Sequence, residues 1–215
     1  MKKFELDKKL TSVSTVTYHA GALGTPDNSV ESVKKALECK AQVIEVDVSF
    51  RPDGTPVMIH KDKPAETEGV LLEEALKLIG KAAKTMINLD LKSTANLPAV
   101  DALIEKYGLS ARAFYTGVFE SWCETVDKNS AIPYYLNYSP STAEKRNPQL
   151  VINKIRACGA IGLNSNYHYV SAHLVETLRK NGIPVSVWTL NNLHTIRKFK
   201  KINPANMTSR RPDKF

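Results

Sequence analysis

The chain has 215 residues, of which 42% are hydrophobic and 24% are charged, as in ordinary globular proteins. It contains no apolar run long enough for a membrane-spanning helix and no apolar segment after its basic start, so these residues predict no signal peptide and we expect a cytoplasmic protein. The net charge of +8 is dispersed, which argues against nucleic-acid binding and favours anionic substrates or contact with an anionic membrane.

Short β-rich runs alternate with helical patterns along the chain. Eight runs are predicted strands, at residues 15–19, 43–50, 85–92, 113–116, 133–137, 160–164, 184–190 and 206–209. Helices are predicted at residues 28–40, 71–79, 97–107, 171–181 and 192–200. In the first helix, Asn28 can cap the N-terminus with Glu31 three residues on, as in a capping box.

The eight alternations favour a closed (β/α)8 TIM barrel that occupies residues 1–215 as a single domain. An open doubly wound sheet is the alternative, but no G-x-G-x-x-G motif follows the first predicted strand. One segment stands outside the alternation. The turn Asp53-Gly54 joins residues 43–50 to a short apolar run at residues 56–60, which predicts an extra β-hairpin strand after the second strand.

Acidic residues alternate with apolar ones on two predicted strands. Residues two apart on a strand share a face, so Glu45 lies beside Asp47, and Asn88 lies with Asp90 and Lys92. Desolvating such carboxylates without a cation costs roughly several kcal/mol each. Three carboxylates at a barrel mouth therefore predict a site for one divalent cation, Mg²⁺ or Ca²⁺. The alternative, that each strand turns its charges to solvent or to salt bridges, loses weight because two strands carry the same pattern.

Two histidines end predicted strands. His19 ends the first strand and His60 ends the hairpin strand, so both are expected near the carboxylates. A single histidine at a strand end is more often structural than catalytic. Cleavage of a phosphodiester, however, needs a base, an acid and a cation that neutralises the phosphoryl oxygens. Together with Lys92, these residues match the requirements of a phosphodiesterase-type site.

Four stretches resemble, in chain order, the motifs of glycerophosphodiester phosphodiesterases. The first, at residues 18–62, is YHAGALGTPDNSVESVKKALECKAQVIEVDVSFRPDGTPVMIHKD, which is similar to the family's opening His-Arg-Gly, Pro-Glu-Asn-Ser/Thr, Glu-x-Asp, Asp-Gly and His-Asp. INLDLK at residues 87–92 resembles the strand with the third acidic ligand followed by Lys. GIPVSVWTLNN and NMTSRRPD, at residues 182–192 and 206–213, resemble the family's last two strands. The resemblance spans the chain and is weakest over about residues 110–160.

The resemblance implies a TIM barrel of the phospholipase C-like type with one divalent metal at the C-terminal rim. By position, the implied metal ligands are Glu45, Asp47 and Asp90. The implied catalytic residues are His19 and His60 as the acid/base pair and Lys92, which would stabilise charge on the phosphate. Trp188 would line the substrate cleft.

The sequence departs from the family pattern at several positions. Ala20 stands where the family has a phosphate-contacting Arg, and Lys61 stands where it has Asp. Asp90 replaces the usual Glu, as in sphingomyelinase D-type relatives, and Arg210 replaces an Asp near the end. Arg210 or Lys61 is a candidate for the missing phosphate contact. Only about ten residues separate His60 from the next helix, where the family has an insertion, so we expect an open cleft.

Three functions compete. The first is a metal-dependent phosphodiesterase that cleaves glycerophosphodiesters to an alcohol and glycerol phosphate. The second is a lipid phosphodiesterase like lysophospholipase D or sphingomyelinase D, favoured by the open cleft, Asp90 and the positive charge. The third is a barrel that binds phosphorylated ligands without turnover, because Ala20 and Lys61 both lie beside expected catalytic residues. The sequence leaves open which His is the acid, whether a cyclic phosphate forms, and the oligomeric state.

Overall fold

The computed structural model describes residues 3–8 and 14–215. Its strands are β1 Thr15–Tyr18, β2 Val43–Phe50, β3 Pro56–Met58, β4 Val70–Leu71, β5 Met86–Leu91, β6 Ala113–Val118, β7 Tyr134–Asn137, β8 Gly162–Asn166, β9 Val185–Trp188 and β10 Asn206–Ser209. Its helices are α2 Val30–Glu38, α3 Leu72–Ile79, α4 Leu97–Lys106, α5 Cys123–Asn129, α6 Thr142–Arg146, α7 Pro148–Ala157, α8 Ala172–Lys180 and α9 Leu193–Ile202. Single 3₁₀ turns are η1 Ala22–Gly24, η2 Glu120–Trp122, η3 Tyr167–Tyr169 and η4 Pro212–Lys214.

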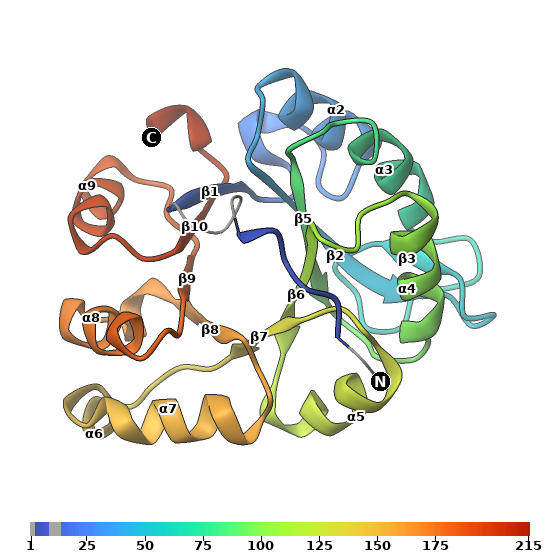
Figure 1. Cartoon of the computed structure of the whole chain (residues 1–215). Coiled ribbons are helices and arrows are strands. Elements are labelled where there is room, and N and C mark those ends of the chain that lie inside the picture. The colour runs from blue at the N-terminus through green and yellow to red at the C-terminus, as the bar shows by residue number, and fades with distance from the viewer. Residues whose placement is uncertain (1–2, 9–13) are drawn as a thin grey trace.

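Eight parallel strands close into a barrel. Strand β1 pairs with β10 on one side and with β2 on the other, and the order continues β2, β5, β6, β7, β8, β9, β10. Helices surround the strands as an outer ring, and the N-terminal segment crosses one end (Figure 1). The predicted (β/α)8 TIM barrel is therefore confirmed.

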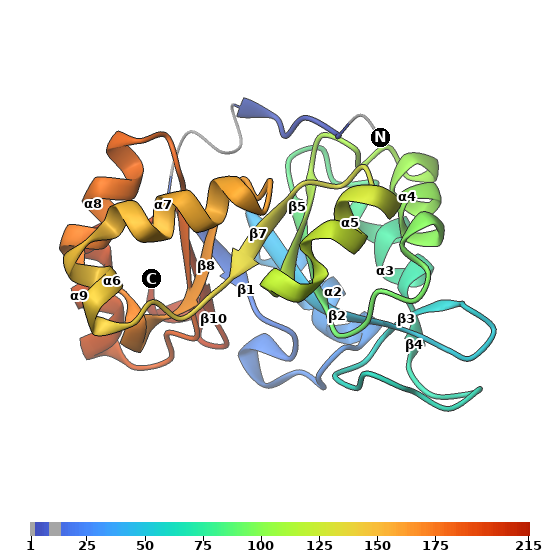
Figure 2. The same cartoon turned by 90° about the horizontal axis from the view of Figure 1, so that it is seen from below.

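The predicted hairpin extends the sheet outside the barrel. Strand β3 runs antiparallel to β2, with Val48 opposite Met58 and Phe50 opposite Pro56. Gly54 in the connecting turn has a φ of 84°, a left-handed conformation that glycine adopts without strain. Strand β4, which the sequence pattern did not predict, adds antiparallel to β3. The extension projects at the end opposite the N-terminal segment (Figure 2).

The two faces of the barrel strands differ in polarity. Outward residues of β2, such as Val46 and Val48, join the large apolar core shared with the helices. Inside the barrel, by contrast, polar side chains bind one another: the side chain of Asn206 accepts from Thr17 Oγ1 at 2.7 Å and donates to Ser186 Oγ at 3.0 Å. A small apolar cluster closes part of the N-terminal end, formed by Val43, Met86, Phe114 and Tyr135.

Two predictions of local structure need correction. The first helix begins at Val30, and its N-cap is Ser29, whose side chain accepts from the backbone N–H of Ser32. Asn28 does not cap the helix, because its side chain is bound to Asp47 instead. Helices α5, α6 and α7 were not predicted. Within the described ranges, no helix combines the length and the apolar character needed to cross a bilayer.

Candidate active site

The three acidic residues predicted from the strand pattern lie together. In the parallel pairing of β2 with β5, Asp47 is directly opposite Asp90 and Glu45 is opposite Asn88. One carboxylate oxygen from each of Glu45, Asp47 and Asp90 lies within 4.8 Å of the other two. Because parallel barrel strands end at the same rim, this acidic cluster sits at the C-terminal end of the barrel.

Glu45 is buried as deeply as Asp47 and more deeply than Asp90. It is 4% exposed, and its Oε2 accepts a hydrogen bond from the backbone N–H of Ala20 at 2.8 Å. Burial and then the charges of Asp47 and Asp90 raise the pKa of Glu45 well above its ordinary value. A bound cation would reverse this effect by stabilising the ionised carboxylate.

Lys92 supplies part of the positive charge that the cluster needs. Its Nζ lies 2.9 Å from Asp47 Oδ1 and also contacts Asp90 Oδ2 closely. Burial acts to lower the pKa of Lys92, but the two carboxylates outweigh it and raise that pKa above its ordinary value. One lysine facing three acids leaves negative charge in excess, and the donors are all hard oxygen atoms. The residues therefore fit a divalent cation such as Mg²⁺ or Ca²⁺.

Asn28 is a site residue that the sequence patterns did not reveal. Its side-chain amide donates to Asp47 Oδ2 at 2.7 Å, and its Oδ1 accepts from the Asp47 backbone N–H at 2.9 Å. The backbone of Asn28 has a φ of 51°, which asparagine tolerates better than most residues. Burial acts to raise the pKa of Asp47, but Lys92 and Asn28 lower it overall. Asn28 thus orients the carboxylate and favours its ionised form.

Asp90 is held from the neighbouring strand β6. Thr116 Oγ1 lies 2.6 Å from Asp90 Oδ1 and 2.8 Å from Asn88 Oδ1. A hydroxyl has one proton to donate, so Thr116 binds one of these oxygens at a time. Since Thr116 lies directly opposite Asp90 in the β5–β6 pairing, the barrel register itself fixes this contact.

Both predicted histidines reach the acidic cluster. His19 Nδ1 lies 2.9 Å from the carbonyl of Ala20 and 3.6 Å from Glu45 Oε2. Burial lowers the pKa of His19, against smaller opposing contributions, so the neutral imidazole is favoured. With Nδ1–H donating to the Ala20 carbonyl, Nε2 is left as the proton acceptor.

His60 approaches from the hairpin side. Its Nδ1 is 3.2 Å from Asp47 Oδ2, and its side chain is 75% exposed. Strand β3 ends at Met58, so His60 follows the strand and does not terminate it as predicted. The backbone N–H of Ile59 donates to the Asp47 carbonyl at 3.2 Å, which holds this segment beside the cluster. The two histidines therefore contact different acids of the same cluster.

Of the two candidates for the missing phosphate contact, Arg210 interacts with the acidic cluster, whereas Lys61 forms an ion pair in a neighbouring loop. Arg210 forms a two-bond pair with Asp27, at 2.6 and 2.9 Å. These hydrogen bonds to Asp27 raise the pKa of Arg210, and the negative charges of Glu45 and Asp47 raise it further, so Arg210 also interacts electrostatically with the acidic cluster. Lys61 instead pairs with Glu68 at 2.7 Å in the loop between β3 and β4.

Trp188 is the last residue of β9 and pairs with Asn166 of β8. Its indole Nε1 is buried and has no hydrogen-bond partner among the described residues. A buried indole N–H is costly to leave unpaired, and an oxygen atom of a ligand is the kind of acceptor that would satisfy it. The position and the free donor are compatible with the predicted role in substrate binding.

Comparisons with known proteins cover most of the chain. A model described as the glycerophosphoryl diester phosphodiesterase family matches residues 68–214, and a model of the menorin N-terminal domain matches residues 16–113. A curated glycerophosphodiester phosphodiesterase from Caldanaerobacter subterraneus subsp. tengcongensis is 23% identical over 216 residues, covering 86% of this chain and 89% of that protein.

Solved structures show the same fold. A structure described as a putative glycerophosphoryl diester phosphodiesterase from Agrobacterium tumefaciens has a TM-score of 0.79 at 17% identity and covers 94% of this chain and 95% of its own. An Oleispira antarctica phosphodiesterase, solved in complex with the product sn-glycerol-3-phosphate, has a TM-score of 0.74 at 17% identity and covers 95% and 96%.

Proposed function

The chain belongs to the glycerophosphoryl diester phosphodiesterase family, and on that premise we propose that it cleaves glycerophosphodiesters to an alcohol and glycerol phosphate. The observation that carries the proposal is the convergence of Glu45, Asp47 and Asp90 with both His19 and His60 at one rim. Such a set combines charge neutralisation with proton transfer, which phosphodiester cleavage requires.

We propose that Glu45, Asp47 and Asp90 hold one divalent cation. Their oxygen atoms, their mutual repulsion and the raised pKa of Glu45 support this assignment. When bound, the cation would supply electrostatic stabilisation to the phosphoryl oxygens. Lys92, already beside Asp47 and Asp90, would place a second positive charge next to the phosphate.

Proton transfer is assigned to the two histidines. We propose that His19 Nε2 accepts the proton of the attacking hydroxyl, either water or a neighbouring substrate hydroxyl, because its Nδ1 is engaged by Ala20. As the P–O bond to the alcohol breaks, protonated His60 gives a proton to the leaving oxygen. The exposure of His60 allows it to exchange protons with solvent, and its Nδ1 lies 3.2 Å from Asp47 Oδ2.

A lipid substrate is the second candidate. Three exposed apolar side chains follow barrel strands at the rim that carries the acidic cluster: Phe119 after β6, Tyr169 after β8 and Leu193 after β9, each 45–51% exposed. Apolar residues around an active-site mouth are suited to substrates presented in a membrane or micelle. The membrane contact predicted from the sequence therefore remains a proposal.

A substrate panel distinguishes these functions. Glycerophosphocholine and lysophosphatidylcholine would be compared with Mg²⁺, with Ca²⁺ and with EDTA. We expect EDTA to abolish turnover and His19→Ala or His60→Ala to lower kcat by about 10²–10⁴-fold. Asp47→Asn should remove both turnover and the rise in melting temperature caused by the metal. Faster release of choline from the lysolipid would favour the lipid enzyme. If glycerol phosphate raises the melting temperature and neither diester is turned over, the protein binds phosphorylated ligands without catalysis.

A further inference from the structure

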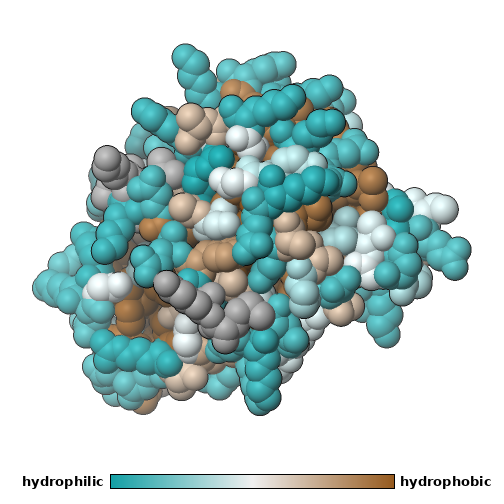
Figure 3. All heavy atoms as spheres, turned by 45° about the vertical axis from the view of Figure 1, so that its right-hand side comes forward, coloured by the Kyte–Doolittle hydropathy of each residue, from teal (hydrophilic) through white to brown (hydrophobic). Residues whose placement is uncertain are grey.

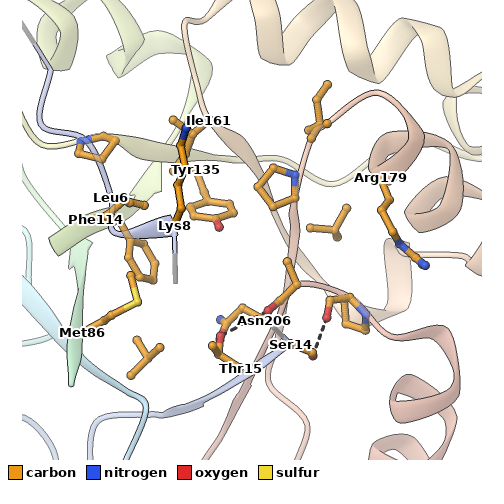
Figure 4. Close-up of a pocket in the computed structure, with 18 of the residues that line it drawn as sticks. Leu6, Lys8, Ser14, Thr15, Met86, Phe114, Tyr135, Ile161, Arg179 and Asn206 are labelled. Atoms are coloured by element: carbon orange, nitrogen blue, oxygen red, sulfur yellow. Dashed lines mark hydrogen bonds between the residues drawn. The ribbon is translucent and has the colours of Figure 1, made fainter. Parts of the chain in front are cut away.

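A second cavity lies at the N-terminal end of the barrel, opposite the acidic cluster. It has a volume of about 810 Å³, within the range of roughly 300–1,000 Å³ usual for small-molecule sites. Figure 4 shows side chains from several strands and from the N-terminal segment around it. None of the residues proposed for phosphodiester cleavage lines this cavity.

The described residues of the N-terminal segment, 3–8, lie over one side of the barrel end. The backbone N–H groups of Phe4 and Asp7 donate to the carbonyls of Ala131 and Ala111, which attach the segment over β6 and β7. Leu6 packs against the apolar cluster beneath it. The cavity continues from there toward β9 and β10, where its wall includes Ile183. In the space-filling view, brown hydrophobic residues are visible between teal hydrophilic ones (Figure 3).

Most of the cavity wall is apolar. Leu6, Met86 and Phe114 line one side, and Ile161 and Tyr135 lie across from Met86 in Figure 4. Water in contact with such a wall gains few hydrogen bonds, so displacing it with an apolar group is favourable. The wall therefore favours a ligand with an apolar body.

Tyr135 adds one polar group to this wall. The residue is 7% exposed, and its hydroxyl can both donate and accept a hydrogen bond. Its ring projects into the cavity in Figure 4. Because Tyr135 lines the cavity, a ligand oxygen that enters it can accept a hydrogen bond from this hydroxyl.

The cavity also has a cationic border. Arg179, in the last turn of α8, lines the cavity and is 51% exposed at its side chain. Glu176 is shared between Arg179 at 3.3 Å and Lys180 at 3.5 Å, so one positive charge of this group is not neutralised by that carboxylate. Lys8 also lines the cavity, and Glu5 is the one acidic residue of its described lining.

We propose that this cavity binds a small amphiphilic anion: a single apolar chain that carries a carboxylate or phosphate head. The chain would lie against Met86, Phe114 and Ile161, Tyr135 would donate to a ligand oxygen, and Arg179 would pair with the head. The proposal is independent of the function assigned to the acidic cluster, because the two sites share no residue.

Calorimetric titration of the full chain tests the proposal with three probes of one chain length: decanoate, decyl phosphate and the uncharged 1-decanol. We expect saturable binding of both anions in a 1:1 ratio, and the tighter of the two identifies the head. Arg179→Gln should weaken the binding affinity for the two anions by about tenfold and the affinity for decanol by less than about twofold. Lys180→Gln is the matched control, since it pairs with the same Glu176 but does not line the cavity.

Two further variants test whether the probes bind inside this cavity. Tyr135→Phe should weaken the binding affinity for all three probes by about threefold, because each has an oxygen that can accept a hydrogen bond. Ala205→Trp, which introduces a large side chain into the lining, should abolish binding of all three probes. Phosphodiester turnover and the melting temperature report whether each variant is folded. The proposal is wrong if decanoate and decyl phosphate do not bind, or if Arg179→Gln and Lys180→Gln change their affinity equally.

Discussion

Asn28 binds Asp47 at two points, through its amide to Oδ2 at 2.7 Å and through Oδ1 to the backbone N–H at 2.9 Å. One side chain thereby fixes both the carboxylate and the strand that carries it. Asn28 and Asp47 are 19 residues apart in the chain, so this pair also ties the start of α2 to strand β2.

Replacing Asn28 tests whether this orientation matters for activity. Asn28→Gly preserves the left-handed backbone but removes both hydrogen bonds, and residues that orient metal ligands typically affect activity by about 10–100-fold. We expect kcat/KM to fall by about that factor and metal affinity to weaken in parallel. Ser29→Ala is the control, because it removes the helix cap, costs about 1 kcal/mol of stability and should leave kcat unchanged. Equal kinetic effects of both variants would reduce Asn28 to a structural role.

Removing Lys92 should expose the repulsion between its two acidic partners. In Lys92→Met, Asp47 and Asp90 face each other without a lysine, so we expect a loss of about 1–3 kcal/mol in the free energy of urea unfolding without metal. Added Mg²⁺ or Ca²⁺ should restore much of that loss, because a cation replaces the missing charge. Lys34→Met, at an exposed position on α2, should change stability by less than about 0.5 kcal/mol. A loss that metal does not restore would contradict the shared cation site.

The Asp27–Arg210 pair should make stability depend on pH in the acid range. The hydrogen bond from Arg210 lowers the pKa of Asp27 below its ordinary value of 3.8, against a smaller opposing effect of burial. A carboxylate with a lowered folded-state pKa stabilises the protein fully above its ordinary pKa, and the contribution is lost as the pH falls through the folded-state value.

We therefore expect the gap in melting temperature between the native chain and Asp27→Asn to be present at pH 6 and to shrink steadily below pH 4. Arg210→Gln should show the same pattern, and the double variant should lose little more than either single one. A gap that stays constant down to pH 2.5 would mean that the ion pair does not contribute.

Trp188 offers a test that separates binding from stability. Trp188→Phe keeps an aromatic ring but removes the indole N–H, which has no partner among the described residues. If substrate accepts that hydrogen bond, KM should rise by about 2–10-fold with kcat little changed. The free variant should be as stable as the native chain or slightly more so, because an unpaired buried donor is gone. A stability loss of more than about 1 kcal/mol with unchanged KM would show that Trp188 serves the core.

The sequence predicted the barrel and the hairpin because both depend on short-range patterns. Alternation of acids and apolar residues on β2 and β5, and Asp53-Gly54 between two β-rich runs, are signals contained within a few residues. Helices α5, α6 and α7 were missed in the stretch where the family motifs are also weakest. Helix α6 has only five residues, too few for a helical period of apolar residues to show, although its capping box at Ser141 is a helix-start signal. In helix α7, charged and apolar residues are mixed near the middle, which weakens the apolar pattern there.

The sequence predicted the site residues that lie on strands, but not the one that reaches the site through a contact between distant parts of the chain. The positions of Glu45, Asp47 and Asp90 follow from alternation and from parallel registry of two strands. The role of Asn28 does not, since an asparagine followed three residues later by Glu31 is also a helix-start pattern, which Ser29 provides here. Only the packing of α2 against β2 distinguishes the two uses.

The pairing of Asp47 directly opposite Asp90 has a consequence for folding. Because side chains alternate along strands, a slip of one residue between β2 and β5 would turn one of these acids out of the barrel and into the apolar layer beneath the helices. Misaligned barrels would therefore lack the proposed metal site. The number of divalent cations bound per chain would then report the fraction of molecules with the native strand alignment, and the cation would favour that alignment over competing registers during refolding.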